Sequence, residues 1–117
     1  MQDYRKLKVW QKSHSLALEV YAAAASLQSR PAWPLQTQIL RAAISIPSNI
    51  AEGAGRSTDR DFRRFLVHSL GSLNEVEYDL LLGRDLGFVP ELTYTRVSDS
   101  VGEVRRMLSG LIASLRV

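Results

Sequence analysis

The chain has 117 residues, 45% of them hydrophobic, and its 15 lysines and arginines exceed its 12 acidic residues by three charges. This length suits one domain, residues 1–117, because a single core fills at roughly 100–150 residues. The chain has no cysteine, which excludes disulfides and thiolate metal sites and suits a reducing compartment. No apolar run approaches the ~20 residues that cross a bilayer, and the polar, basic start has no signal-peptide pattern. We therefore expect a cytoplasmic domain without a membrane segment.

Residues Lys8 to Gln28 form the first segment with helical apolar periodicity. Its alanine run, 22–25, favours a helix because alanine loses no side-chain entropy on being fixed there. Pro31 and Pro34 follow, and each lacks a backbone N–H and restricts the residue before it. The sequence therefore predicts that the first helix stops before these prolines.

The second predicted helix starts near Leu35. Its apolar stripe advances in steps of four, three, four and four, through Leu35, Ile39, Ala42, Ile46 and Ile50. Pro47 lies inside this stripe, where its ring should clash with the carbonyl of Ala43, so we expect a kink there rather than an end. The helix should close at residues 52–55, where glycine permits a left-handed C-cap.

Thr58 begins the third predicted helix, as an N-cap with Asp61 at the third helical position. An apolar seam then continues to about Leu86, which predicts a helix of about 27 residues and ~40 Å. Gly71 lies inside this helix and should cost about 1 kcal/mol relative to alanine. A neighbouring helix that approaches closely at Gly71 would justify that cost.

The last predicted helix follows the turn 87–90, with Pro90 suited to a first helical position. It repeats the seam pattern, with apolar residues at Val97, Val101, Val104, Leu108, Leu111 and Leu115. Two such seams on long helices joined by short turns predict an all-α fold, an antiparallel up-down-up-down four-helix bundle with its second helix kinked near Pro47.

The usual catalytic patterns are missing from the sequence. His14 and His68 lie on different predicted helices, and neither has a glutamate three residues before it, as a di-iron bundle requires. Residues 53–55 resemble the start of a dinucleotide fingerprint, but no strand precedes them and the third glycine is absent. We expect no enzyme, no cofactor and no metal, with His68 on a helix face or at an interface rather than acting as a general base.

Three acidic residues of the third predicted helix offer a weaker metal-site candidate. Glu75 and Asp79 are four residues apart and share a face, whereas Glu77 points elsewhere. Because no further oxygen ligands occur at loop spacing, a solvated acidic face is the expected alternative.

Charge is distributed unevenly along the chain, with a net +5 in residues 1–64 and −2 in residues 65–117. Twelve of the fifteen cations are arginine, whose planar fork binds phosphate in a bidentate manner. Such a basic face can hold a nucleic-acid backbone with little base readout. The alternative is that these cations only keep the protein in solution or pair with Glu52, Asp59 and Asp61. The candidate nucleic-acid-binding residues are Lys8, Lys12, Arg41, Arg56, Arg60, Arg63 and Arg64.

Apolar residues exceed what one inward stripe per helix requires. On the third predicted helix, Phe65, Leu70 and Leu81 lie off the seam that runs from Phe62 to Leu80. Surplus apolar surface points to contacts between subunits, and a wider core stripe is the alternative.

The run Ser45-Ile-Pro-Ser-Asn-Ile-Ala-Glu-Gly53, preceded by Arg41 and by residues 9–14, resembles the 23S rRNA intervening-sequence protein family, also called four helix bundle proteins. Residues 62–66 and 71–75 match the third-helix pattern of that family. The resemblance implies a four-helix bundle that assembles as a homopentamer. It also implies a relation to the accessory variability protein of diversity-generating retroelements, a basic pentamer that binds nucleic acid and a reverse transcriptase.

Pro47, Asn49, Glu52 and Gly53 carry the family signature, and we interpret them as structural residues. Asn49 and Glu52 could satisfy backbone groups at the helix kink or bond across a subunit boundary, with direct ligand contact as the alternative. Family members commonly have an arginine where this chain has Leu40, so the basic surface is weaker here. The leading hypothesis is a non-enzymatic oligomer that binds RNA or DNA. The alternative is a scaffold that docks a partner protein.

Overall fold

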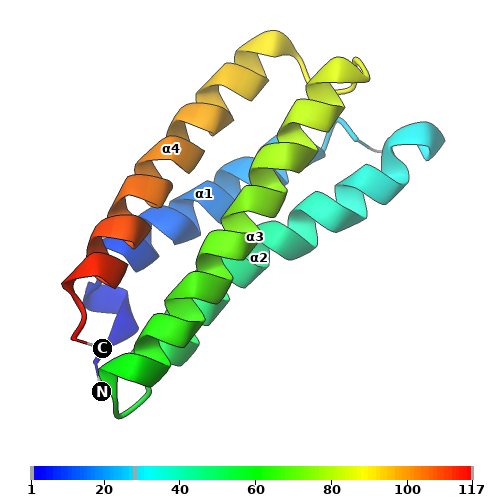
Figure 1. Cartoon of the computed structure of the whole chain (residues 1–117). Coiled ribbons are helices and arrows are strands. Elements are labelled where there is room, and N and C mark those ends of the chain that lie inside the picture. The colour runs from blue at the N-terminus through cyan, green and yellow to red at the C-terminus, as the bar shows by residue number, and fades with distance from the viewer. Residues whose placement is uncertain (1, 28, 117) are drawn as a thin grey trace.

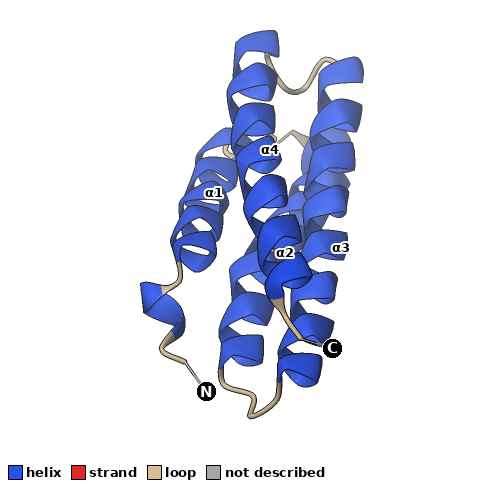
Figure 2. Ribbon diagram, turned by 60° about the vertical axis from the view of Figure 1, so that its left-hand side comes forward, coloured by secondary structure: helices blue, strands red, loops and turns tan. Residues whose placement is uncertain are grey.

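The structure, a computed structural model, describes residues 2–27 and 29–116. Four α-helices make up most of the chain: α1 (Lys8–Ala24), α2 (Trp33–Ala54), α3 (Asp59–Asp85) and α4 (Glu91–Ser114). Two short 3₁₀ turns, Tyr4–Lys6 and Arg30–Ala32, precede α1 and α2. Within the described residues there is no strand (Figure 2), so the all-α prediction is confirmed.

The helices pack into an elongated bundle with extents of 44 × 21 × 21 Å. The α2–α3 contact is the most extensive, and α1 packs against both α2 and α4. Both chain ends and the α2–α3 turn lie at one end of the bundle, and the other two connections lie at the opposite end (Figure 1). At the end with the α2–α3 turn, a backbone hydrogen bond joins the N-terminal segment to α2, because the Gln2 N–H donates to the Ala54 carbonyl at 2.8 Å.

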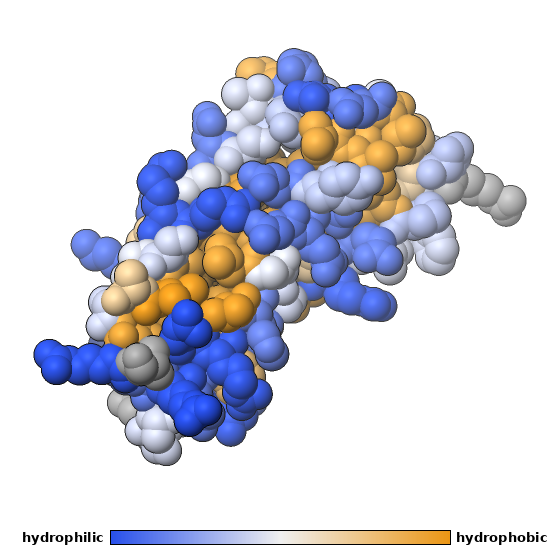
Figure 3. Space-filling model, viewed as in Figure 1, coloured by the Kyte–Doolittle hydropathy of each residue, from blue (hydrophilic) through white to orange (hydrophobic). Residues whose placement is uncertain are grey.

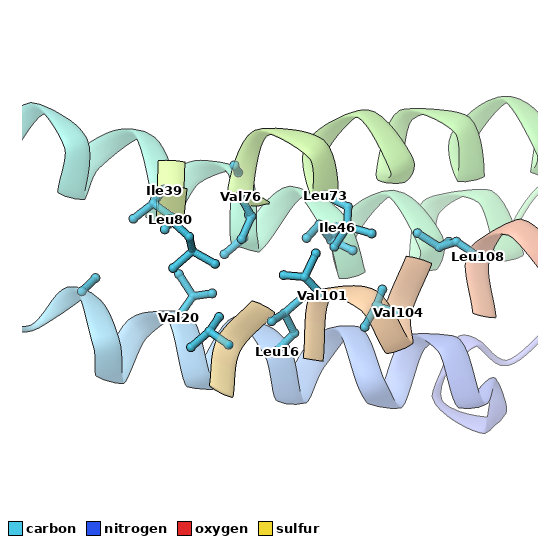
Figure 4. Close-up of a cluster of buried hydrophobic side chains, with 14 of the residues drawn as sticks. Leu16, Val20, Ile39, Ile46, Leu73, Val76, Leu80, Val101, Val104 and Leu108 are labelled. Atoms are coloured by element: carbon cyan, nitrogen blue, oxygen red, sulfur yellow. The ribbon is translucent and has the colours of Figure 1, made fainter. Parts of the chain in front are cut away.

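Side chains from all four helices form the core (Figure 4). Each predicted seam supplies its own share: Leu16 and Val20 from α1, Ile39 and Ile46 from α2, Leu73, Val76 and Leu80 from α3, and Val101, Val104 and Leu108 from α4. All of these side chains are at most 2% exposed, because the three-and-four spacing keeps them on one face of each helix.

Helix α1 ends at Ala24, earlier than expected, and the predicted end at Gln28 lies outside the described residues. The Leu27 N–H donates to the Ala24 carbonyl at 2.9 Å in a turn that buries the Leu27 side chain. Helix α2 begins at Trp33 with Pro34 in its first turn, where no N–H donor is needed. Pro90 is the N-cap of α4, so it precedes the first helical residue instead of occupying it.

Helix α2 runs without interruption through Pro47, so the expectation that the proline does not end it is confirmed. The left-handed C-cap predicted at its end is wrong. Gly55 has a φ of −81°, and right-handed turn bonds close the helix, with the Arg56 N–H donating to the Gly53 carbonyl at 3.0 Å. Among the described residues, Gly87 alone has a positive φ, at the turn between α3 and α4.

The start of α3 agrees with the predicted N-cap. The Thr58 Oγ1 accepts a hydrogen bond from the Asp61 N–H at 3.2 Å, and Asp59 and Asp61 place negative charge near the positive end of the helix dipole. The helix spans 27 residues, as the seam predicted. The expectation of a close helix contact at Gly71 is wrong, because Gly71 is exposed and no atom lies within 4 Å of the position of a Cβ.

Candidate nucleic-acid interface

An open, basic pocket of about 730 Å³ lies between the first turns of α3 and the C-terminal segment. The Arg116 N–H donates to Asp59 Oδ2 at 3.3 Å, which holds the C-terminal segment beside the start of α3. Positions 60, 63, 64, 67 and 68 recur at helical spacing, so their side chains share one face of α3. The residues that line the pocket are Arg60, Asp61, Arg63, Arg64, Val67, His68 and Arg116.

The arginines at this end differ in how far local acids neutralise them. Arg56 Nη2 lies 3.2 Å from Glu52 Oε1, and Arg64 Nη2 lies 3.9 Å from Asp61 Oδ1. Arg60 and Arg63 are exposed and have no ion pair within the described part of the chain. Exposed pairs contribute at most about 1 kcal/mol, so Arg56 and Arg64 can exchange their partners at little cost. Arg60 and Arg63 are therefore the cations best placed to meet an anion.

Phe65 organises this cluster, a role that the sequence did not indicate. The guanidinium carbons of Arg56 and Arg64 each lie 4.8 Å from the centre of its ring, a cation–π arrangement. The His68 ring meets Phe65 edge-on, with 6.2 Å between ring centres. Phe65 thus orients two cations and one imidazole at the pocket edge. Its position in the sequence, close to Arg60, Arg63 and Arg64, is the feature from which this role could have been predicted.

The other three candidate cations lie away from the pocket. Lys12 Nζ pairs with Glu103 of α4 at 3.1 Å. Lys8 lines a shallow hollow with Arg106 and Met107, between α1 and α4. Arg41 is exposed on α2, about 20 Å along the helix axis from its end. The structure therefore brings Arg56, Arg60, Arg63 and Arg64 together around Phe65 and the basic pocket, whereas Lys8, Lys12 and Arg41 do not line this pocket.

The residues that carry the family signature lie where α2 meets α3. Asn49 Nδ2 donates to the Ser45 carbonyl at 2.8 Å and to Ser45 Oγ at 2.9 Å, and Ser72 Oγ donates to the same hydroxyl at 2.8 Å. Asn49 thus bonds to the backbone of its own helix across the turn that contains Pro47, and links α2 to α3 through Ser45.

Glu52 and Gly53 connect this signature to the arginine cluster. The carboxylate of Glu52 is exposed and pairs with Arg56. A Cβ at Gly53 would lie 2.8 Å from the Phe65 Cβ and 2.9 Å from the Phe62 ring, so only glycine lets α3 approach α2 here. The close approach predicted for Gly71 is therefore found at Gly53.

A second, mainly apolar groove of about 460 Å³ runs between α1 and α2. Leu18, Tyr21 and Ile44 along it are 46–60% exposed. At one end the rings of Trp10 and His14 stack with 5.1 Å between their centres, and Pro47 contributes to the floor. The surplus residues predicted on α3, Phe65, Leu70 and Leu81, are only half-exposed. The exposed apolar side chains of α3 are Val67 and Tyr78, and the apolar groove lies between α1 and α2.

The acidic face of α3 is only partly solvated, which corrects the expectation for Asp79. Glu75 and Glu77 are exposed, and Glu77 pairs with Arg105 at 2.9 Å. Asp79 is 8% exposed, and its Oδ2 has no hydrogen-bond partner among the described residues. Burial, assisted by the nearby charge of Glu75, raises the pKa of Asp79 to about 6. No group of three potential metal-ligating side chains is present in the described part of the chain.

Hydrophilic residues gather at the end of the bundle that holds the α2–α3 turn and the C-terminal segment, beside an apolar patch (Figure 3). The basic pocket lies at this end. Over residues 2–27 and 29–116, no helix combines the length and the hydropathy that a bilayer crossing requires.

A family model for the 23S rRNA-intervening sequence protein matches residues 5–110, which include the bundle, the α2 signature and most of the basic pocket. The chain belongs to this family. Among solved structures, the chain is similar to the crystal structure of a protein of unknown function from the S23 ribosomal protein family of Bacteroides thetaiotaomicron. The two share 26% identity over 91% of this chain and 99% of that chain, with a TM-score of 0.85. No match was found among curated proteins.

Proposed function

We propose that this family member is a non-enzymatic, cytoplasmic, self-associating protein that binds RNA or DNA through phosphate contacts of its arginine-rich end. The proposal rests on Arg60 and Arg63. Both line the same pocket, and neither forms an ion pair with an acidic side chain among the described residues. Arginine binds phosphate oxygens in a bidentate fork, and each neutralised phosphate releases condensed counterions. In this proposal, Arg56 and Arg64 also bind phosphate, but each must first break its weak, exposed ion pair.

Salt dependence tests this proposal. For a single strand, each phosphate contact makes the slope of log K against log salt concentration more negative by about 0.7. We expect Arg60→Gln/Arg63→Gln to make that slope less negative by about 1.4 per subunit in contact and to weaken binding about 25-fold near 0.1 M salt. The measurement is fluorescence anisotropy of a labelled RNA at several salt concentrations.

The matched control is Arg96→Gln/Arg106→Gln, which removes the same charge from exposed positions of α4. It should retain most of the affinity, because the proposed contacts depend on position rather than on net charge. An equal loss of affinity in both double variants would show that net charge, and not the position of these arginines, controls binding. No binding of any nucleic acid at low salt would refute the proposal.

We also propose that the chain assembles with itself, as the pentamer that the sequence resemblance implied. The apolar groove between α1 and α2 supports this, because Leu18 is 60% exposed there beside Tyr21 and Ile44. Contiguous exposed apolar surface of this kind is typical of association sites. A cyclic assembly would also repeat the basic end around a ring, so the electrostatic fields of the subunits would add.

Leu18→Glu is expected to dissociate the assembly, because it buries a charge in the proposed contact. Light scattering should give a multiple of the 13.1 kDa chain mass for the unmodified protein and the single mass for this variant. Leu92→Glu is the matched control, since Leu92 is 76% exposed at the start of α4 and outside the groove. A monomeric unmodified protein, or an unchanged mass for Leu18→Glu, would contradict the proposed interface.

The proposal includes the finer features of the predicted architecture. It takes the bundle as antiparallel, up-down-up-down, supported by the three short connections at alternating ends (Figure 1). It takes α2 as bent near Pro47, supported by the hydrogen bond that the proline cannot donate. It also retains the relation to the accessory variability protein of retroelements, whose implied basic pentamer agrees with the arginine end.

A scaffold that docks a partner protein is the second candidate. Exposed apolar side chains at the other end of the bundle favour it, with Leu86 54% and Leu92 76% exposed. Charge reversal at Arg60, Arg63 and Arg64 separates the two functions, because it should abolish nucleic-acid binding and spare a protein partner held at the opposite end.

A further inference from the structure

The basic pocket has a shape and a lining that backbone contacts alone do not require. Exposed cations on an open surface are enough to bind the phosphates of a duplex, whereas these arginines line a pocket with a volume of about 730 Å³. Pockets that enclose small organic ligands measure about 300–1,000 Å³. One nucleotide, base and phosphate together, therefore fits its size.

The lining divides into a charged part and a part suited to a base. Arg60 and Arg63 offer guanidinium groups without described acidic partners. Val67, which is 41% exposed, and the imidazole of His68 offer an apolar and a planar surface one turn further along α3. Planar side chains of this kind stack on bases, whereas arginines bind phosphates.

His68 is held in place at the pocket by its neighbour. The centres of the His68 and Phe65 rings are 6.2 Å apart in an edge-on contact, and two guanidinium carbons each lie 4.8 Å from the centre of the Phe65 ring. A ring that is positioned in advance loses little freedom when a base stacks on it. Arg116, on the segment tied to Asp59, also lines the pocket.

We propose that this pocket receives one unpaired nucleotide, with the base against Val67 and His68 and the phosphate on Arg60 and Arg63. The inference rests on the proposed function and adds the class of ligand, single-stranded nucleic acid. Bases inside a duplex are stacked and paired, so a duplex meets only the arginines unless a nucleotide flips out at an energetic cost. The protein therefore prefers single strands to duplexes.

The test uses a labelled 20-nucleotide RNA alone and annealed to its complement, with anisotropy titrations of the full chain at 0.1 M salt. We expect the single strand to bind at least tenfold more tightly. His68→Ala should weaken single-strand binding about tenfold, the size of one lost stacking contact, and leave duplex binding and the salt slope unchanged.

The control variant is Tyr78→Ala, which removes an exposed aromatic residue from the same helix outside the pocket and should change neither affinity. Circular dichroism is the measurement that checks that both variants fold. Equal affinities for single strand and duplex, or a His68→Ala variant that binds single strands normally, would overturn this inference while the phosphate-binding function stands. Absence of binding to both probes at low salt would overturn the proposed function and this inference together.

Discussion

Replacing Gly53 with alanine is expected to lower the free energy of unfolding by about 2 kcal/mol, although alanine is the better helix former. The added Cβ would lie 2.8 Å from the Phe65 Cβ and 3.3 Å from the Phe62 carbonyl oxygen. Both atoms belong to or adjoin the α3 backbone, so no side-chain rotation can relieve the overlap and the two helices must separate. Overpacking of this kind typically costs 1–3 kcal/mol.

Gly71→Ala is the matched control, and it should change stability in the opposite direction. Gly71 is also inside a helix, but it is exposed and nothing lies within 4 Å of its Cβ position. The substitution therefore gains helix propensity, up to about 1 kcal/mol, without a steric cost. Urea denaturation followed by circular dichroism measures both variants. If the two substitutions change stability in the same direction, close packing at Gly53 is not what constrains that position.

The same substitution also tests the link between packing and the arginine end. Phe65 orients Arg56 and Arg64 and contacts His68, and its Cβ is the atom that Gly53 allows to approach. A shift of α3 at Phe65 would therefore move the lining of the basic pocket. We expect Gly53→Ala to weaken nucleic-acid binding even under conditions where the variant remains folded.

The helices and their core faces were predictable from the sequence because they depend on local periodicity. The apolar seam of α3 specifies the length of the helix. Thr58 and Asp61 specify its N-cap, and they form the hydrogen bond expected of an N-cap. Periodicity carries no information about which glycine meets a neighbouring helix, since that depends on the relative placement of α2 and α3. The close approach is for this reason predicted at Gly71 but found at Gly53, which the sequence indicates only as part of the helix C-cap and of the family signature.

The candidate site was predictable only in part, for the same physical reason. Arg60, Arg63 and Arg64 lie close together in sequence, so helical geometry alone places them on one face. Arg116 joins them from the far end of the chain through a backbone bond to Asp59, a tertiary contact that spacing does not reveal. Lys8 and Lys12 were grouped with the arginines by charge, but Lys12 pairs with Glu103 across α1 and α4.

Asp79 gives the second large expected effect, a loss of stability as the pH rises from about 4 to about 6. Its pKa is 3.8 in the unfolded chain and about 6 in the bundle, so the folded state holds a proton that the unfolded state has released. Raising the pH through this window therefore favours unfolding, and above pH 6 the full cost is present. We expect about 2 kcal/mol, below the full conversion of the shift, because water still reaches part of the carboxyl group.

Asp79→Asn removes this titration and should raise the free energy of unfolding by about 2 kcal/mol at pH 7.5, with little change at pH 4, because the amide stays neutral at both values. Asp99→Asn makes the same chemical change at an exposed position of α4 and should stay within about 0.5 kcal/mol at both pH values. Urea denaturation across pH 4–8 measures the difference. Parallel pH profiles for Asp79→Asn and the unmodified protein would mean that the folded chain already solvates or pairs this carboxylate.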